Sequence, residues 1–433
     1  MLAGLVIVSL VAHAGSVREA RQALEQAERP TSAEGSVLAA YTSRALASHP
    51  LVDAAFARWE AAVHRTARAR ALPEPSVSFG AYLQAVETRV GPQQARIGLR
   101  QVLPWPTRLT AGADASAEVA RAAEHQFDAV ALAVTERVAV AYWTLWSVRA
   151  ARALHADHLE VLDGLSVSVR GRVETGAASL ADLQQVDLSR ARLADDLVRM
   201  DAEERAAGAG LAAAVGELGP WKTDTPPPPP AVPAETTETL AAAVSAHPSL
   251  AAIAAGARSA DARARQAGAG RLPGLSLGAD WIITGELPGP IVPPDNGKDA
   301  VVAVFGLTLP LWQGVHAREV AASRATAEAL RADQRAAELD ARAALTATLA
   351  EVEDSARRVG LIGGTLLPQA ESAHRSVLGS VSAGRGSVTQ ALLSQADLLD
   401  LRVELARARA THAGSWARLR ALVGRDVLTA EAP

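Results

Sequence analysis

The side chains that could do chemistry are few in this chain of 433 residues. His155 and His158 are three positions apart, so a helix would place both imidazoles on one face, as a metal-binding pair requires. On a long polar helix such residues are more often solvated, and we favour that interpretation. The chain has no Cys and only two Met, so it offers no thiolates and no series of thioethers for Cu(I). We therefore expect no metal site.

Catalytic motifs are also missing. The sequence contains no phosphate-binding G-x-x-x-x-G-K-[ST], no G-x-S-x-G and no H-E-x-x-H. Lys and Arg number 43 against 47 Asp and Glu, a formal net charge of −4 without basic tracts, which argues against a nucleic-acid partner. We predict a protein that is not an enzyme and carries no cofactor.

The N-terminus has the pattern of an export signal. Leu2–Val11 is a continuous apolar run, and Ala12-His13-Ala14 follows it as a small-x-small cleavage site. A bilayer-spanning helix needs ~20 apolar residues, so this run is too short to be one. We expect a signal peptide over residues 1–14 and an N-terminal segment over 15–36. A helix of the mature fold is the alternative.

The remaining chain is a duplication. His49-Pro50 returns as His247-Pro248, and Leu103-Pro104 returns as Leu309-Pro310. Repeats this long indicate two copies of a structural unit rather than a short solenoid repeat. We place the first repeat at 37–218 and the second at 234–426, with a short C-terminal tail at 427–433. The Pro-rich linker 219–233 is either unstructured or a strap lying over the helices.

Each repeat predicts two strands followed by a helical hairpin. Apolar residues alternate with small or polar ones at about 76–85, 95–103, 275–284 and 300–309, which is typical of strands with one apolar face and of the length that a tilted membrane strand needs. Apolar spacings of four and three then predict coiled-coil hairpins over 107–216 and 313–424. Gly176 and Gly384 are the expected turns. Gly363-Gly364 and Pro368 predict a kink in the second hairpin.

Four amphipathic strands cannot close a barrel within one chain. A bilayer does not tolerate an open sheet edge, because the backbone groups there would have no partners. Two copies would supply eight strands and three would supply twelve, and only the wider barrel would leave a lumen. Long helices continuing from the strands would extend the wall of that lumen, an architecture for transit.

With these features the chain resembles the TolC-type outer membrane efflux proteins. The duplicated plan, the two Leu-Pro pairs and the Gly-centred turns at Arg172–Gln185 and Ser380–Ser394 carry the resemblance. Its general character is nearest to the metal- and cation-efflux branch of CusC and CzcC. The fold that the resemblance implies is an α+β membrane protein of duplicated helix–strand–strand–helix–helix units. Its long α-helical coiled-coil barrel joins a trimeric 12-strand β-barrel to which each chain gives four β-strands.

The resemblance also implies partners and a function. They are a homotrimer in outer membrane lipid with a long periplasmic extension, a periplasmic adaptor (membrane fusion) protein and an inner-membrane pump. Together these would form a tripartite efflux system with a passive duct for metal cations or drugs. A non-enzymatic periplasmic coiled-coil scaffold, or the adaptor itself, is the alternative.

The candidate sites follow from this architecture. The turns at the hairpin tips would contact the adaptor, or be ordinary hairpin turns; their residues are Arg172, Gly176, Ser179, Gly384, Arg385 and Ser387. Asp182 and Gln390, each six residues after the turn glycine, would form a tunnel constriction, or Asp182 would only favour the first turn of a helix.

Four further residues belong to the barrel. Arg96 and Arg100 lie on the polar side of their strand, so we expect them in the lumen, where they could tune charge selectivity. Trp105 and Trp312 follow strand ends. They would lie at the membrane interface, or pack at the junction between barrel and helices.

Overall fold

The computed structural model describes residues 36–224, 229–291, 293–383 and 385–427. The expected signal peptide 1–14, nearly all of segment 15–36, Gly384 and most of the tail 427–433 lie outside the described residues. The chain forms two compact units. The sheet unit comprises Arg58–Glu124 and Ala251–Arg335, and the helical unit comprises the described residues up to Ala57, His125–Leu250 and the residues from Ala336 onward.

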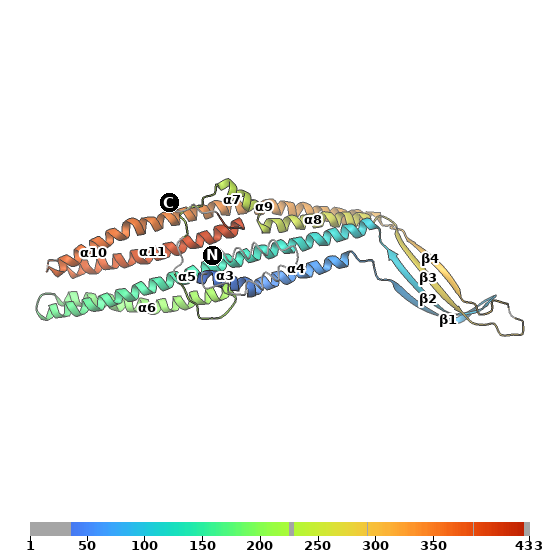
Figure 1. Cartoon of the computed structure of the whole chain (residues 1–433), viewed down its shortest axis with the longest axis horizontal. Helices are drawn as coiled ribbons and strands as arrows, with labels where there is room; N and C mark the ends of the chain where they lie inside the picture. Colours follow the sequence, from blue (N-terminus) through green and yellow to red (C-terminus); the bar gives the residue numbers. More distant parts are fainter. Residues whose placement is uncertain (1–35, 225–228, 292, 384, 428–433) are drawn as a thin grey trace. The chain divides into compact units, whose positions relative to one another are not determined.

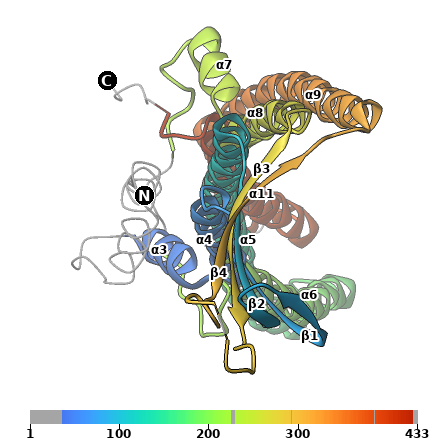
Figure 2. The same cartoon turned by 90° about the vertical axis from the view of Figure 1, so that its right-hand side faces the viewer.

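The sheet unit is built around four antiparallel strands in the order β1-β2-β3-β4 (Figures 1 and 2). They are β1 (Ser76–Thr88), β2 (Gly91–Leu103), β3 (Gly274–Thr284) and β4 (Ala300–Thr308). β2 and β3 come from different halves of the sequence and pair along most of their length, from Leu103↔Leu275 to Gln93↔Thr284. The sheet therefore joins the two repeats edge to edge.

The alternation of the sequence gives the sheet two unlike faces. Odd-numbered residues pair with odd-numbered ones across all three ladders over most of the strands, for example Leu99 with Ala279 and Leu277 with Phe305. Their side chains make one apolar face that is exposed in the single chain, with members Val77, Phe79, Leu83, Leu99, Leu277, Trp281, Val301, Phe305 and Leu307. A row this apolar needs a covering of lipid or protein.

Four helical segments complete the sheet unit. They belong to α4 (Pro50–Ala69), α5 (Pro106–Glu174), α8 (Pro248–Ala269) and α9 (Gln313–Leu361). Small residues let α8 lie close to α5: the Ser259 hydroxyl donates to the Ala115 carbonyl at 2.9 Å. On its other side α8 approaches α9, where Asp261 and Arg331 form an ion pair.

The helical unit contains the two long hairpins. The first pairs α5 with α6 (Leu180–Val215); the second pairs α9 and α10 (Leu367–Ser382) with α11 (Val388–Val423) (Figure 1). Where Gly363-Gly364 predicts a kink or break, a π-helical turn, η1 (Ile362–Leu366), interrupts the α-helix, whereas α5 is continuous for 69 residues. The expected seam is buried at Phe127, Val138 and Leu145.

A His-Pro step starts the second helix of each repeat. α3 (Val37–Ser48) and α7 (Thr237–Ser245) each end there, and α4 and α8 begin at the proline. The His49 Nε2 lies 3.3 Å from the Ala213 carbonyl, and its Nδ1 accepts the Leu51 amide at 3.0 Å. His247 repeats this arrangement with the carbonyl of Ala421 and the amide of Ser249. We call each of these a His latch, because it ties a helix start to the end of a returning helix.

The described residues of the linker lie along helices as a strap. The Tyr142 hydroxyl accepts the Asp224 amide, and the Tyr41 hydroxyl accepts the Lys222 amide at 2.8 Å. Farther along, the Pro230 carbonyl accepts from the Trp416 indole at 2.8 Å and lies 3.0 Å from the His412 Nε2. The described Pro229 and Pro230 lie outside any helix or strand, so a carbonyl such as that of Pro230 stays available to side chains.

One helical stretch of the described residues, Thr237–Ala269, is long and apolar enough to cross a membrane by length and composition alone. It consists of α7 and α8, which are separated at Ala246-His247. Ala255, Ala257 and Ala260 of α8 are buried, as in a packed helix.

Candidate functional site

The first hairpin turns through a Schellman motif. The Ala177 amide bonds to the Arg172 carbonyl at 2.7 Å and the Gly176 amide to the Val173 carbonyl at 3.0 Å. Gly176 has φ +76°, which side chains with a Cβ adopt only with strain. The Arg172 guanidinium donates to the Ala177 carbonyl at 3.3 Å, so the expected contact residue also braces the turn.

Asp182 and Ser179 form a capping box at the start of α6. The Ser179 hydroxyl accepts the Asp182 amide at 3.2 Å, and the Asp182 carboxylate accepts the Ser179 amide at 3.0 Å. The carboxylate also accepts the Ser179 hydroxyl at 2.7 Å. These bonds, the hydroxyl first and the amide second, lower the pKa of Asp182. Asp182 is therefore ionised and held locally by the helix start.

The second turn is built differently. Ser387 caps α11 by accepting the Thr389 amide at 3.2 Å. Gln390 stands where Asp182 stands in the first repeat, but within the described residues it makes no reciprocal bond to Ser387. The amides of Arg385 and Gly386 both bond to the Ser380 carbonyl, at 3.0 and 2.9 Å. The Arg385 side chain is exposed.

The starts of the two returning helices lie together in the helical unit. Val388 and Leu392 of α11 share a buried cluster with Val169 of α5 and Val186 of α6. The structure thus brings the starts of α6 and α11 to one end of the helical unit (Figure 1). Ser179 and Asp182 stand at the first of these helix starts, and Ser387 and Gln390 at the second. An exposed pair of turns on a packed end is a geometry suited to contact with another protein.

The polar face of the sheet carries a charge pair that sequence reasoning missed. Arg96 of β2 pairs with Asp280 of β3, across the seam between the repeats. Gly98 makes room for it: a Cβ at Gly98 would lie 2.4 Å from the Asp280 carboxylate. Asp280 is the one carboxylate of β3 and stands at an even-numbered position, on the same side as Arg96, and that was the available signal. Arg100 is on the same face, is exposed, and has no carboxylate partner among the described residues.

The two expected interface tryptophans differ. The Trp105 indole donates to the Pro273 carbonyl, which links the end of β2 to the chain entering β3. This contact favours the alternative in which Trp105 packs at the junction. Trp312 is 78% exposed, directly before α9.

His158 of the helical unit, one of the two histidines singled out as a possible metal pair, makes a hydrogen bond within the protein. His158 is buried and its Nδ1 lies 2.9 Å from the Gln395 amide nitrogen. Burial lowers the pKa of His158, and neighbouring His155 and His374 add to the effect. Among the described residues no group of three or more His, Asp or Glu side chains could hold a metal ion.

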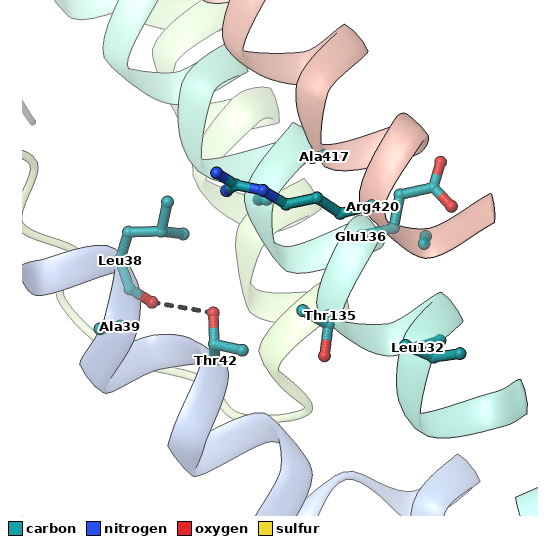
Figure 3. A pocket seen from close by; sticks show the side chains of 10 residues that line it. Leu38, Ala39, Thr42, Leu132, Thr135, Glu136, Ala417 and Arg420 are labelled. Atoms are coloured by element: carbon teal, nitrogen blue, oxygen red, sulfur yellow. Dashed lines mark hydrogen bonds between the residues drawn. The ribbon is translucent and has the colours of Figure 1, made fainter. Parts of the chain in front are cut away.

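A small, largely enclosed cavity lies between α3, α5 and α11 in the helical unit (Figure 3). It measures about 30 Å³ and is lined by apolar residues with Glu136 and Arg420 at its edge. That volume holds water but no larger ligand. Burial raises the pKa of Glu136 and lowers that of Arg420. The cavity is therefore a packing defect beside the partly buried Arg420 and not a substrate site.

Comparison with solved structures defines the class of protein. The outer membrane protein VceC from Vibrio cholerae superposes with a TM-score of 0.71 at 18% identity, covering 90% of this chain and 96% of that one. A membrane protein from Pseudomonas aeruginosa gives 0.75 at 16% identity, with 90% and 94% covered, and CusC gives 0.74 at 14%, with 90% and 92% covered. The fold is that of the outer membrane channels.

The sequence comparison supplies the family. Residues 239–425 match the family model of the outer membrane efflux proteins. No curated protein matches the chain. The resemblance to the TolC-type outer membrane efflux proteins is confirmed: the second half carries the sequence pattern of the family, and nine-tenths of the chain carries the fold. Members of this family are passive channels, so the chain is not an enzyme.

Proposed function

We propose that the chain is the outer membrane component of a tripartite efflux system. Three copies form a passive duct that exports substrates across the periplasm and the outer membrane, together with a periplasmic adaptor and an inner-membrane pump. CusC, VceC and CmeC, which share the fold, are outer membrane or transmembrane channel proteins by description.

The observation that carries this proposal is the sheet of the single chain. It has an exposed apolar face and two terminal strands, β1 and β4, each paired on one side only among the described residues. In lipid, unpaired strand edges are costly, so β4 of one copy would pair with β1 of the next. Three copies supply twelve strands, enough to leave a lumen.

The polar face of the sheet then lines that lumen. Asp280 offsets the charge of Arg96, which leaves Arg100, among the described strand residues, as the uncompensated charge on this face. Three copies of Arg100 would repel cations and attract anions. This charge favours organic anions or zwitterions as cargo over free metal cations, although the pump would make the primary selection.

The hairpin tips serve as the docking end. The adaptor would contact backbone and side-chain groups of both turns. In the first turn these belong to Arg172, Gly176 and Ser179, and in the second to Gly384, Arg385 and Ser387. A constriction by Asp182 and Gln390 requires the carboxylate to reach the tunnel axis while it caps α6. We therefore place the docking role of these turns ahead of gating.

The test is the native mass of protein extracted from outer membrane fractions, followed by conductance in planar bilayers. We expect a trimer in mild detergent and ion-conducting pores whose reversal potential in a salt gradient favours anions. Arg100→Gln should lower that preference, whereas the double change Arg96→Gln with Asp280→Asn, which removes a neutral pair, should preserve it. A detergent-independent monomer or dimer would contradict the channel and favour the periplasmic scaffold.

A further inference from the structure

A basic groove lies between α8 and α9 in the sheet unit. It measures about 570 Å³ and opens to solvent, and its lining residues are Asp261, Ala264, Arg265, Gly268, Arg271, Val320 and Arg324. Gly268 and Ala264 keep its floor low, so the three guanidinium groups border an open trough. None of the functions described above uses this groove.

The charges in the groove do not balance. Asp261 is already paired with Arg331 of α9. Arg265 reaches Asp114 of α5 at 3.3 Å, a contact in which both side chains are more than half exposed and which is worth little. Within the described residues, no carboxylate bonds to Arg271 or Arg324. The groove therefore has an excess of positive charge, and its guanidinium groups have N–H donors available for a ligand.

The side of the sheet unit on which this groove opens follows from the chirality of the L-residues and from the direction of the backbone hydrogen bonds of β3. In β3 the Thr284 amide points toward the β4 side, bonding to Asp299, whereas the Gly285 amide bonds to the Pro92 carbonyl of β2. Odd-numbered residues of β3 thus aim their backbone groups at β2. For L-residues, a viewer facing the apolar odd-numbered side chains with β3 running upward finds β2 on the right and β4 on the left.

The helices below the strands keep the same order. α8 runs upward into β3, with α5 on the right, where Ser259 bonds to Ala115, and α9 on the left, where Gly268 faces Val320. A right-handed helix in that position turns Asp261 and Arg265 toward the same viewer. The groove therefore opens on the side of the apolar sheet face, which is the lipid side of the proposed barrel.

The groove also lies at the level where that apolar face ends. Arg271 is three residues before the start of β3, and its carbonyl accepts from the side-chain amide of Gln313 at 3.3 Å. The chain just before Gln313 exposes Leu309, Leu311 and Trp312, which are 58%, 75% and 78% accessible. Exposed Trp beside Arg at the edge of an apolar band is the composition of a membrane interface.

We infer that this groove binds the phosphate group of an anionic phospholipid in the leaflet nearest the helices. The inference rests on the proposed function, because it needs the sheet to lie in a membrane. Arg271 and Arg324 donate to the phosphate oxygens, and Arg265 turns from its exposed contact with Asp114 to join them. The bound headgroups fix the depth of the barrel in the membrane.

The test uses native mass spectrometry of the full protein released from detergent with added phosphatidylglycerol, phosphatidylcholine or inorganic phosphate. Each Arg near an anionic lipid contributes about fivefold to binding, so Arg271→Gln with Arg324→Gln should weaken phosphatidylglycerol binding about 30-fold. The matched control, Arg263→Gln with Arg318→Gln, removes two exposed charges from the same helices outside the groove and should retain lipid.

The outcomes separate the two proposals. Preferential retention of phosphatidylglycerol, lost only in the groove variant, supports the lipid site. Equal retention in both variants, equal binding of phosphatidylcholine, or displacement of the lipid by inorganic phosphate overturns it. The oligomer in the same spectra reports on the channel: a trimer without lipid preference contradicts only the groove, whereas a monomer contradicts the channel whatever lipid it carries.

Discussion

The two halves of the chain contain the same elements but differ where each hairpin turns. The first returning helix starts with a complete capping box between Ser179 and Asp182, and the second starts with a single bond from Ser387. The first ascending helix is continuous, whereas the second is interrupted by the π-helical turn at Ile362–Leu366. A duplicated unit has thus kept its plan while its two hairpins have become unequal in their helix caps and helix continuity.

The opposite ends of the hairpins have stayed alike. Both His latches make the same two bonds, and both returning helices end at a glycine with positive φ, Gly216 at +88° and Gly424 at +74°. The His latches that fix the helices are thus the same in both halves, whereas the hairpin tips that would contact another protein differ. π-Helical turns are frequent at functional sites, which agrees with movement in the second hairpin.

The largest effect is expected where a latch packs against its glycine. A Cβ at Gly216 would lie 3.1 to 3.2 Å from Pro50 and His49, whereas a Cβ at Gly424 would lie at least 3.3 Å from its neighbours. Strain in the left-handed region adds ~1–2 kcal/mol to both. Gly216→Ala should lower stability by ~2–3 kcal/mol and Gly424→Ala by ~1–2 kcal/mol, measured by urea unfolding with circular dichroism.

Gly164→Ala is the control for these two changes. It lies inside α5 with open space around it, so it should raise stability by up to ~1 kcal/mol. Equal losses of stability in Gly216→Ala and Gly424→Ala would show that the closer contact of Gly216 with Pro50 and His49 does not affect the free energy of unfolding.

The unequal caps predict the next largest effect. Ser179→Ala removes a reciprocal cap and should destabilise the start of α6 by ~1 kcal/mol, more than Ser387→Ala at α11. Hydrogen exchange of the first-turn amides of the two helices reports each loss directly. A larger loss at α11 would reverse the proposed ranking of the two tips.

The π-helical turn offers a third test. Replacing Gly363 and Gly364 by Ala should stiffen the second hairpin, because each glycine in a helix costs ~0.5–1 kcal/mol relative to Ala. A Cβ atom can be accommodated at both positions without a steric clash. We expect slower hydrogen exchange over residues 359–367 and weaker export, with Gly360→Ala as the neighbouring control. Unchanged exchange would mean that the turn is no softer than α5.

The smallest effect is the pH response of a latch. Burial lowers the pKa of His247 below the ordinary value of 6.5, so the unfolded chain binds a proton more readily than the folded one. Stability should therefore fall as the pH drops from about 6.5 through the pKa of the folded state. His247→Gln keeps a donor for the Ala421 carbonyl and should flatten this part of the stability profile. An unaltered profile would assign the pH response to other groups.

The sequence by itself determined the elements and their class. Local patterns were enough for this: the alternation in Leu275–Ile283 and the four-three spacing from Phe127 onward. Each pattern arises because one face of the strand or helix is apolar, so it predicts the element without knowledge of its partners. Gly363-Gly364 likewise predicted an interruption of the helix at the position of η1. The resemblance built on these patterns then led to the family.

Only the tertiary structure decided which side chains meet. Arg96 and Asp280 are 184 residues apart, and their register follows from the pairing of β2 with β3. Asp182 proved to be a helix cap because its carboxylate found the Ser179 amide and hydroxyl. The groove of Arg271 and Arg324 exists because α8 and α9 lie side by side with small residues between them. Such contacts depend on register, hand and packing distance, and periodicity specifies none of these.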